Sequence, residues 1–219
     1  MARQNIEKRL QILRVSYELF SGVEYEAVSL ADIAKRAEIS KSLLQYYYPQ
    51  KIEIVRDLLS DILNISFSYT DVLSEPDEDV MQEISDFNML FFKAVEYNYH
   101  LNQFIMSSVS RPQLLDLWIE TICSWLRKVC GENTFSYLQL KTALCFAMGG
   151  SMHLFQHKDE LGIDYHFYTE NHIRTILGFL KYDQKTIDEI CGKTRDRVEQ
   201  VDINAFLKYC EDSIQWFSL

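Results

Sequence analysis

Apolar residues recur at intervals of three and four along most of this chain, the spacing that places side chains on one face of an α-helix. The first such stripe joins Ile6, Leu10, Leu13, Tyr17 and Phe20. The 219 residues include only 7 Gly and 3 Pro, so the chain is poor in the residues that β-rich folds use at turns. No alternating run is long enough to indicate a sheet. We therefore expect an all-α protein.

Two short helices are predicted after the first one. Ser29 and Asp32 have the spacing of a capping box at the start of one helix. Ser40 is placed to cap the other, which runs from Lys41 to about Tyr47. Two short helices joined by a tight turn form a candidate helix-turn-helix motif over about residues 29–48.

The remaining pattern predicts a second, larger helical region. A long helix follows Pro49 and ends before the acidic stretch at residues 74–79. We expect an N-terminal three-helix unit at residues 1–56 and a C-terminal helical bundle at residues 57–219. Further helices are predicted at about 80–99, 101–109, 112–130, 134–158 and 166–181, with two more in 184–219.

The charge is distributed unevenly between these two regions. The whole chain carries a formal charge of −10, which argues against a general nucleic-acid coat protein. Residues 1–56 hold 9 basic and 7 acidic residues, a balance of +2, so residues 57–219 carry −12. The N-terminal end is therefore the part suited to face an anion.

In a helix-turn-helix unit the second helix enters the DNA major groove, and the first crosses the phosphate backbone. Gln can pair with adenine, Lys can donate to guanine or phosphate, and Tyr can reach phosphates or thymine methyl groups. Leu44 and Tyr48 are expected to face the small core instead. The predicted DNA-binding residues are Ser29, Lys41, Ser42, Gln45, Tyr46, Tyr47 and Lys51, the last holding a phosphate at the start of the next helix.

In order and spacing, these elements resemble the DNA-binding domain of the tetracycline-repressor (TetR) family. The resemblance covers roughly residues 6–60. It implies an all-helical repressor with a helix-turn-helix DNA-binding domain at residues 1–56 and a C-terminal helical-bundle domain for regulation, ligand binding and dimerisation at residues 57–219. Such a repressor dimerises through its C-terminal domain and releases DNA when a small molecule binds there. The residues that carry it are Phe20, Tyr25, Ser29-Leu30-Ala31-Asp32-Ile33-Ala34, Ala37, Ile39-Ser40-Lys41 and Tyr46-Tyr47-Tyr48-Pro49-Gln50-Lys51.

Four residues depart from the family pattern. Glu24 and Glu38 stand where Gly is usual, Gln45 where Tyr is usual, and Tyr48 where Phe is usual. The two glutamates cost turn stability if their positions need a positive φ. Gln45 changes a base contact, so the operator sequence of relatives does not transfer to this chain.

Aromatic side chains are dense in the C-terminal region, and they either line an apolar ligand cavity or fill the core. The resemblance favours a cavity for a small, largely apolar or aromatic effector. The predicted ligand-binding residues are Phe91, Tyr97, Phe104, Met106, Trp118, Trp125, Phe146 and Met152.

Gly149 and Gly150 interrupt an otherwise good helix, where each Gly costs about 1 kcal/mol relative to Ala. Small residues allow close helix approach, so this helix is expected to pack against its symmetry mate in a homodimer or against residues 166–181. A local kink or a ligand contact is the alternative. His153 and His157 lie on the same face and are assigned to the interface, although their spacing also suits a metal.

Other function classes lack their motifs. The five cysteines form no C-x-x-C pair, and no paired-carboxylate motif, nucleophile elbow or phosphate-binding Gly loop is present. We therefore expect no enzyme, metal or cofactor. The start Met-Ala-Arg-Gln-Asn lacks an apolar export region, so a cytoplasmic protein without a membrane partner is expected.

The predicted function is a one-component DNA-binding transcriptional regulator, with double-stranded operator DNA, a small-molecule effector and a second copy of the chain as partners. Repression is the majority behaviour of the family that it resembles. An interaction adaptor with a structural helix-turn-helix and no operator is the alternative, suggested by Glu24, Glu38 and the negative charge. The effector, the operator sequence and the regulated genes do not follow from the residues.

Overall fold

The computed structural model describes residues 2–75, 78–109 and 111–217, and within these ranges it contains helices and no strand. This confirms the all-α prediction. The elements are α1 (Ala2–Gly22), η1 (Tyr25–Ala27), α2 (Leu30–Arg36), α3 (Lys41–Tyr47), α4 (Lys51–Ser68), η2 (Tyr69–Val72), α5 (Val80–Tyr97), α6 (Tyr99–Val109), α7 (Pro112–Cys130), α8 (Tyr137–Gln156), α9 (Lys158–Leu161), α10 (Tyr165–Phe179), α11 (Gln184–Gln200) and α12 (Ile203–Ser213).

The predicted helices are all present, with small differences at their ends. The helix predicted from residue 134 begins at Tyr137, because Ser136 caps it by accepting a hydrogen bond from the backbone N–H of Gln139. The same segment ends at Gln156, and a separate short helix, α9, follows. Within the acidic stretch 74–79, residues 76 and 77 lie outside the described part of the chain, as do residues 218 and 219 of the C-terminal segment.

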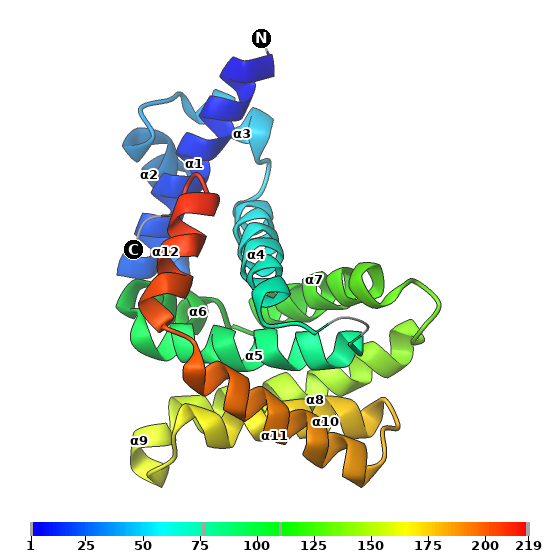
Figure 1. Ribbon diagram of the computed structural model, residues 1–219. Helices are drawn as coiled ribbons and strands as arrows, with labels where there is room; N and C mark the ends of the chain where they lie inside the picture. The colour runs from blue at the N-terminus through cyan, green and yellow to red at the C-terminus, as the bar shows by residue number, and fades with distance from the viewer. Residues whose placement is uncertain (1, 76–77, 110, 218–219) are drawn as a thin grey trace.

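The helices form two bodies that α4 connects. Figure 1 shows α1, α2 and α3 gathered at one end, with α4 running from them into the larger body formed by α5 to α11. In the larger body α8 packs along α10, and α5 packs against α10 and α11. Helix α4 begins beside the small body and reaches the large one, so it crosses the boundary expected at residue 56.

The first helix follows the predicted stripe only in part. Leu13, Tyr17 and Phe20 are buried, as expected from their spacing. Ile6 is exposed, because the first turns of α1 project beyond the helices that pack on it (Figure 1). The apolar face of α1 is therefore used in its C-terminal two thirds.

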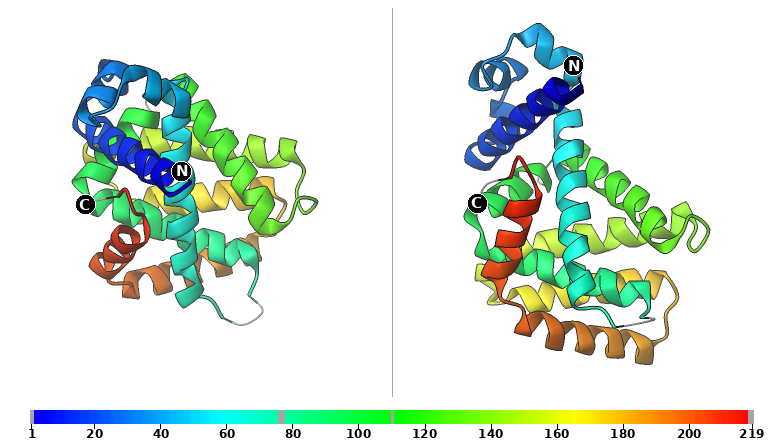
Figure 2. Two further views of the ribbon diagram at one scale, coloured as in Figure 1. Left: turned by 90° about the horizontal axis from the view of Figure 1, so that it is seen from above. Right: turned by 45° about the horizontal axis from the view of Figure 1, so that its top comes forward.

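The C-terminal segment docks between the two bodies. Figure 2 shows α12 lying beside α4, with the end of the chain close to α1. The Tyr17 ring of α1 lies 5.5 Å from Trp216 and 5.1 Å from Phe217, measured between ring centroids. The Trp216 indole N–H donates to Asp61 of α4 at 2.7 Å, and Arg14 of α1 donates to the Gln215 carbonyl at 2.8 Å. The tail thus fastens α1 to α4.

A buried ion cluster joins α5 to α11. Arg197 donates to Asp86 at 2.8 Å and to Glu78 at 2.7 Å, and the side chains of both carboxylates are almost completely buried. Thr194 donates to the remaining oxygen of Asp86 at 2.7 Å. The charges are therefore paired and hydrogen-bonded, as burial requires.

None of the helices in the described ranges is both long enough and apolar enough to cross a membrane.

Candidate functional site

Helix α3 carries the predicted DNA-contacting face. Its N-terminus is capped by Ser40, whose hydroxyl accepts from the Leu43 N–H at 3.1 Å, and the prediction of this cap is confirmed. Buried Leu44 anchors one side of the helix. The opposite side is exposed and presents Lys41, Ser42, Gln45 and Tyr46, with Tyr46 76% exposed. Within the described residues, none of these four side chains makes a hydrogen bond or an ion pair.

Leu43 belongs to the same exposed face, although the sequence analysis did not predict it as a DNA-binding residue. It is 37% exposed, although it is a large apolar residue on a short helix. An apolar side chain on a recognition helix can contact a thymine methyl group. Its position between Ser42 and the buried Leu44 was the available signal, because only one of two adjacent leucines can face the core.

The turn between α2 and α3 contains a strained residue. Glu38 has φ 53°, in the left-handed region that favours glycine, so the concern about this position is confirmed. Glu24 has φ −51°, so the same concern about Glu24 was wrong. The Glu24 carboxylate instead lies 3.8 Å from Arg111, at the start of α7. Glu38 therefore carries a backbone cost that Glu24 does not.

Ser29 is occupied in capping α2. Its hydroxyl donates to Asp32 at 2.6 Å and accepts from the Asp32 N–H at 3.2 Å, and the Ser29 N–H donates to the same carboxylate. The predicted capping box is thus confirmed. Hydrogen bonds from the Ser29 hydroxyl and backbone lower the pKa of Asp32. Tyr47 is also engaged, since its hydroxyl donates to Asn5 of α1 at 2.9 Å.

Lys51 has a role that differs from the predicted phosphate contact. Its ammonium donates to the carbonyl oxygens of Tyr25 at 2.5 Å and Val28 at 2.6 Å. It also lies 3.8 Å from the centroid of the Tyr25 ring, and burial lowers its pKa. The loop before α2 folds over the start of α4 and takes up two of the three donors of Lys51. Its place in the sequence could not show these partners.

Asp57 of α4 holds the small body to this helix. One of its oxygens accepts from Arg9 of α1 at 2.8 Å and from the Tyr48 hydroxyl at 2.8 Å. Tyr48 is buried, as predicted, and burial raises its pKa. A movement of α4 would therefore carry α1 and the end of α3 with it.

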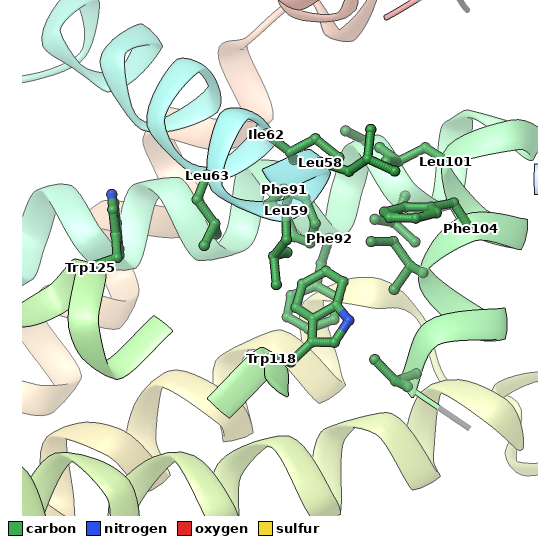
Figure 3. Close-up of a cluster of buried hydrophobic side chains, with 14 of the residues drawn as sticks. Leu58, Leu59, Ile62, Leu63, Phe91, Phe92, Leu101, Phe104, Trp118 and Trp125 are labelled. Atoms are coloured by element: carbon green, nitrogen blue, oxygen red, sulfur yellow. The ribbon is translucent and has the colours of Figure 1, made fainter. Parts of the chain in front are cut away.

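The larger body contains an apolar cavity with a volume of about 50 Å³. Figure 3 shows Leu59 and Leu63 extending from α4 toward Phe91 and Phe92 of α5, with Trp118 of α7 below them. The cavity is lined by residues of α4 to α8 and α10: Leu63, Ile84, Phe87, Asn88, Phe91, Phe92, Ile105, Trp118, Ile122, Trp125, Leu126, Leu144, Met148, Met152, His172 and Ile176.

Four of the eight predicted ligand-binding residues line this cavity: Phe91, Trp118, Trp125 and Met152. The other four lie elsewhere. Tyr97 and Phe146 lie outside the cavity wall, and their side chains are 65% and 64% exposed. Phe104 packs on Tyr17 of α1 at 5.4 Å, and Met106 lines a groove near the end of α1.

His172 is a buried lining residue that the sequence analysis missed. It lies on α10 between Tyr168 and Ile176, which are also buried. Its Nδ1 lies 2.9 Å from the Ser151 hydroxyl of α8. Burial lowers the pKa of His172 to about 4, so the imidazole is neutral at pH 7. The spacing of four between Tyr168, His172 and Ile176 was the signal that could have indicated it.

The predicted dimer residues lie on an exposed face of α8. Gly149, Gly150, His153 and His157 are all exposed. A Cβ added at either glycine would meet no atom of the chain within 4 Å. Of the two predicted partners for this helix, the segment 166–181 packs on α8 within the chain, as α10.

His153 and His157 are not joined by a third residue that could complete a metal site in the described ranges. The rings of His153 and His157 lie 4.5 Å apart, and Glu160 is 3.1 Å from His157. No group of three or more His, Cys, Asp or Glu side chains in the described ranges is arranged to hold a metal ion.

The exposed N-terminal part of α3, after a capped α2 and a tight turn, is the arrangement of a helix-turn-helix DNA-binding protein. Residues 12–58 match the family model of bacterial regulatory proteins, tetR family. The match covers the N-terminal helices, so this part of the chain is similar to the DNA-binding domain of tetR-family regulators.

Solved structures of regulators have a similar fold over most of the chain. A TetR transcriptional regulator from Rhodococcus sp. RHA1 is 14% identical, with a TM-score of 0.56 over 81% of this chain and 98% of its own. RolR in complex with resorcinol is 13% identical, with a TM-score of 0.57 over 87% and 96%. The TetR regulator TylP from Streptomyces fradiae is 15% identical, with a TM-score of 0.52 over 90% and 99%. No curated protein matches the sequence significantly.

Proposed function

We propose that this chain is a homodimeric repressor that leaves its operator when a small, largely apolar or aromatic ligand binds in the cavity of the larger body. The observation that carries the proposal is the position of α4. Its first turns hold the DNA-binding helices through Asp57, and Leu63 near its other end lines the cavity.

The ligand acts by favouring one position of α4 over another. A ligand shifts an equilibrium only through its different affinities for the two states. A ring that pushes against Leu63 favours the state in which α4 is displaced, and Asp57 transmits this displacement to α1 and the end of α3. The complex of RolR with resorcinol supports a small aromatic compound as the class of ligand.

The dimer is proposed to form on the exposed faces of α8 and α10. These faces combine Gly149 and Gly150 with exposed apolar side chains, including Phe146 of α8 and Phe167 of α10. Phe146 stacks on Phe179 of α10 at 5.0 Å, so apolar side chains of the two helices meet there. A twofold axis here would present two copies of α3 to half-sites roughly 34–36 Å apart.

DNA binding is tested by fluorescence anisotropy with a duplex from beside the protein's own gene, over a series of salt concentrations. Tyr46→Ala and Lys41→Ala should each weaken binding by about tenfold or more, and Lys41→Ala should also reduce the salt dependence if it removes a phosphate contact. Tyr99→Ala is the matched control, because Tyr99 of α6 is 69% exposed and lies outside α3.

Saturable binding that both α3 variants weaken supports the regulator. The alternative is tested with duplexes from a genome-wide selection. If the protein binds none of them more tightly than a scrambled duplex, the result would favour the interaction adaptor instead. Light scattering at micromolar concentration tests the dimer, and a monomer would overturn that part of the proposal. A cross-link that fixes the two α3 helices at the half-site spacing should abolish release by ligand.

A further inference from the structure

The cavity wall contains no charged side chain, yet it is not purely apolar. Asn88 and His172 are among its lining residues, together with the indoles of Trp118 and Trp125. An ion that entered this space would lose its hydration without meeting an opposite charge, which is strongly unfavourable. The wall therefore selects uncharged ligands.

The hydrogen bonds around His172 determine which nitrogen carries its proton. The Ser151 hydroxyl has one hydrogen, and it donates to the Ala147 carbonyl at 2.7 Å. We therefore assign the proton to His172 Nδ1, so that the imidazole donates in the 2.9 Å contact with this hydroxyl. Because the ring is neutral, Nε2 carries a lone pair and is an acceptor.

Trp118 supplies the complementary group. Its indole Nε1 is buried and has no hydrogen-bond partner among the described residues. An indole N–H can only donate, and a buried donor without a partner is costly. In Figure 3 Trp118 extends from α7 toward Phe91 and Phe92, the aromatic part of the cavity wall. A donor without a partner on this wall indicates that a ligand would supply the acceptor.

The volume of the cavity adds a second requirement. A space of about 50 Å³ is smaller than the roughly 150 Å³ of an engineered cavity that holds benzene. A six-membered ring must therefore displace side chains, and Met148 and Met152 on the wall are flexible enough to move. Leu63 and Trp125 also line a groove of about 410 Å³ between α4 and α7, so they stand between the cavity and this groove.

We propose that the cavity binds an uncharged aromatic ring bearing a hydroxyl group, which accepts from Trp118 Nε1 and donates to His172 Nε2, with access from the groove past Leu63 and Trp125. A hydroxyl is both a donor and an acceptor, so one group on the ligand can accept from Trp118 and donate to His172. The inference rests on the proposed function, since it specifies the ligand of that same site.

The test uses four probes of similar size with the full-length protein: phenol, toluene, benzoate and benzylammonium at pH 7, measured by calorimetric titration. Phenol should bind about tenfold more tightly than toluene, because each hydrogen bond to a buried group contributes roughly that factor. Benzoate and benzylammonium should not bind measurably. Trp118→Phe and His172→Phe should each lower the affinity for phenol about tenfold and leave the affinity for toluene unchanged.

Trp125→Phe is the matched control, because it removes an indole from the same helix and the same wall. It should change the affinities for phenol and toluene by equal factors. Circular dichroism establishes that each variant is folded, and His172→Phe remains informative if Trp118→Phe unfolds. Toluene binding as tight as phenol, equal losses for both probes in Trp118→Phe and His172→Phe, or no binding of any probe would overturn the assignment.

The anisotropy measurement with DNA separates this result from the proposed function. Phenol that binds without releasing DNA would leave the site intact and refute release by this ligand. DNA binding that persists while no probe binds would leave the regulator intact and refute this ligand class.

Discussion

Helix α3 and the cavity wall are held in place by contacts of different range. The N-terminal cap of α3 is a hydrogen bond between Ser40 and Leu43, which are three residues apart. The exposed side chains of α3 contribute little to the hydrophobic core. The cavity wall combines helices from α4 to α10, and its buried His172 is held by Ser151, twenty-one positions away. Substitutions on α3 should therefore change DNA affinity and spare stability, whereas substitutions around the cavity should change both.

Trp216→Ala tests whether the small body depends on a distant part of the chain, and it should have the largest effect on stability. Trp216 is almost completely buried and packs on Tyr17 of α1. Truncation of a buried Trp typically costs about 3–5 kcal/mol in the free energy of unfolding. We expect about 4 kcal/mol in urea unfolding followed by circular dichroism.

Trp216→Phe is the graded control, because it keeps most of the ring packing and removes only the hydrogen bond to Asp61. It should cost about 1–2 kcal/mol, since it leaves the half-buried Asp61 carboxylate without this donor. If Trp216→Ala costs less than about 1 kcal/mol, the tail does not hold α1, and the small body is stabilised by its local contacts alone.

Arg197→Leu tests the long-range contacts of the larger body. It leaves Asp86 buried without its positive partner. Such a change typically costs about 3–5 kcal/mol in the free energy of unfolding. Because Arg197 is partly exposed, we expect a loss of about 3 kcal/mol. The double variant with Asp86→Asn should recover part of the loss, because the amide oxygen still accepts from Thr194. A double variant that is less stable than Arg197→Leu would mean that the charge of Asp86 is not the source of the cost. Operator affinity at low temperature should be unchanged in both.

The sequence predicts the small body well because its signals are local. Ser29 with Asp32, and Ser40, mark the starts of α2 and α3 within a few residues, and both caps are present. Helical periodicity likewise places the helices of the larger body to within a few residues. Lys51 shows the limit of such inference, since its partners are backbone carbonyls of a loop more than twenty positions earlier.

The cavity is less predictable because periodicity does not say which neighbour a helix face meets. The sequence analysis assigns both Trp118 and Phe146 to the ligand cavity, yet Trp118 is buried among α4, α5 and α8, and Phe146 lies on the exposed face of α8. The difference depends on the packing of the whole bundle. For the same reason, the place where the C-terminal segment docks could not be predicted.

His172 gives the larger body a dependence on pH. Its pKa is about 4 in the folded protein and 6.5 in the unfolded chain, so between these values the unfolded state binds a proton that the folded state does not. Stability from this group is complete above pH 6.5 and falls as the pH is lowered toward 4. We expect a loss of roughly 2 kcal/mol between pH 7 and pH 5.

The measurement compares urea unfolding of the wild type and His172→Gln at pH 7, 6 and 5. Glutamine does not titrate, so the difference between the two proteins isolates this histidine from all other groups. A constant difference at the three pH values would show that the pKa of His172 is not lowered in the folded state.

Glu38→Gly should give the smallest effect, and it tests the strictly local character of the small body. Glu38 has φ 53°, where glycine avoids the steric cost of a Cβ, so the substitution should stabilise the protein by about 1 kcal/mol. Glu24→Gly removes the same charge at the other departure from the family pattern, but its φ of −51° offers no such relief. It should instead be neutral or slightly destabilising, because it also adds freedom to the unfolded chain. Equal effects of the two substitutions on the urea midpoint would attribute the change to charge, whereas a gain at Glu38 alone would show that backbone conformation decides it.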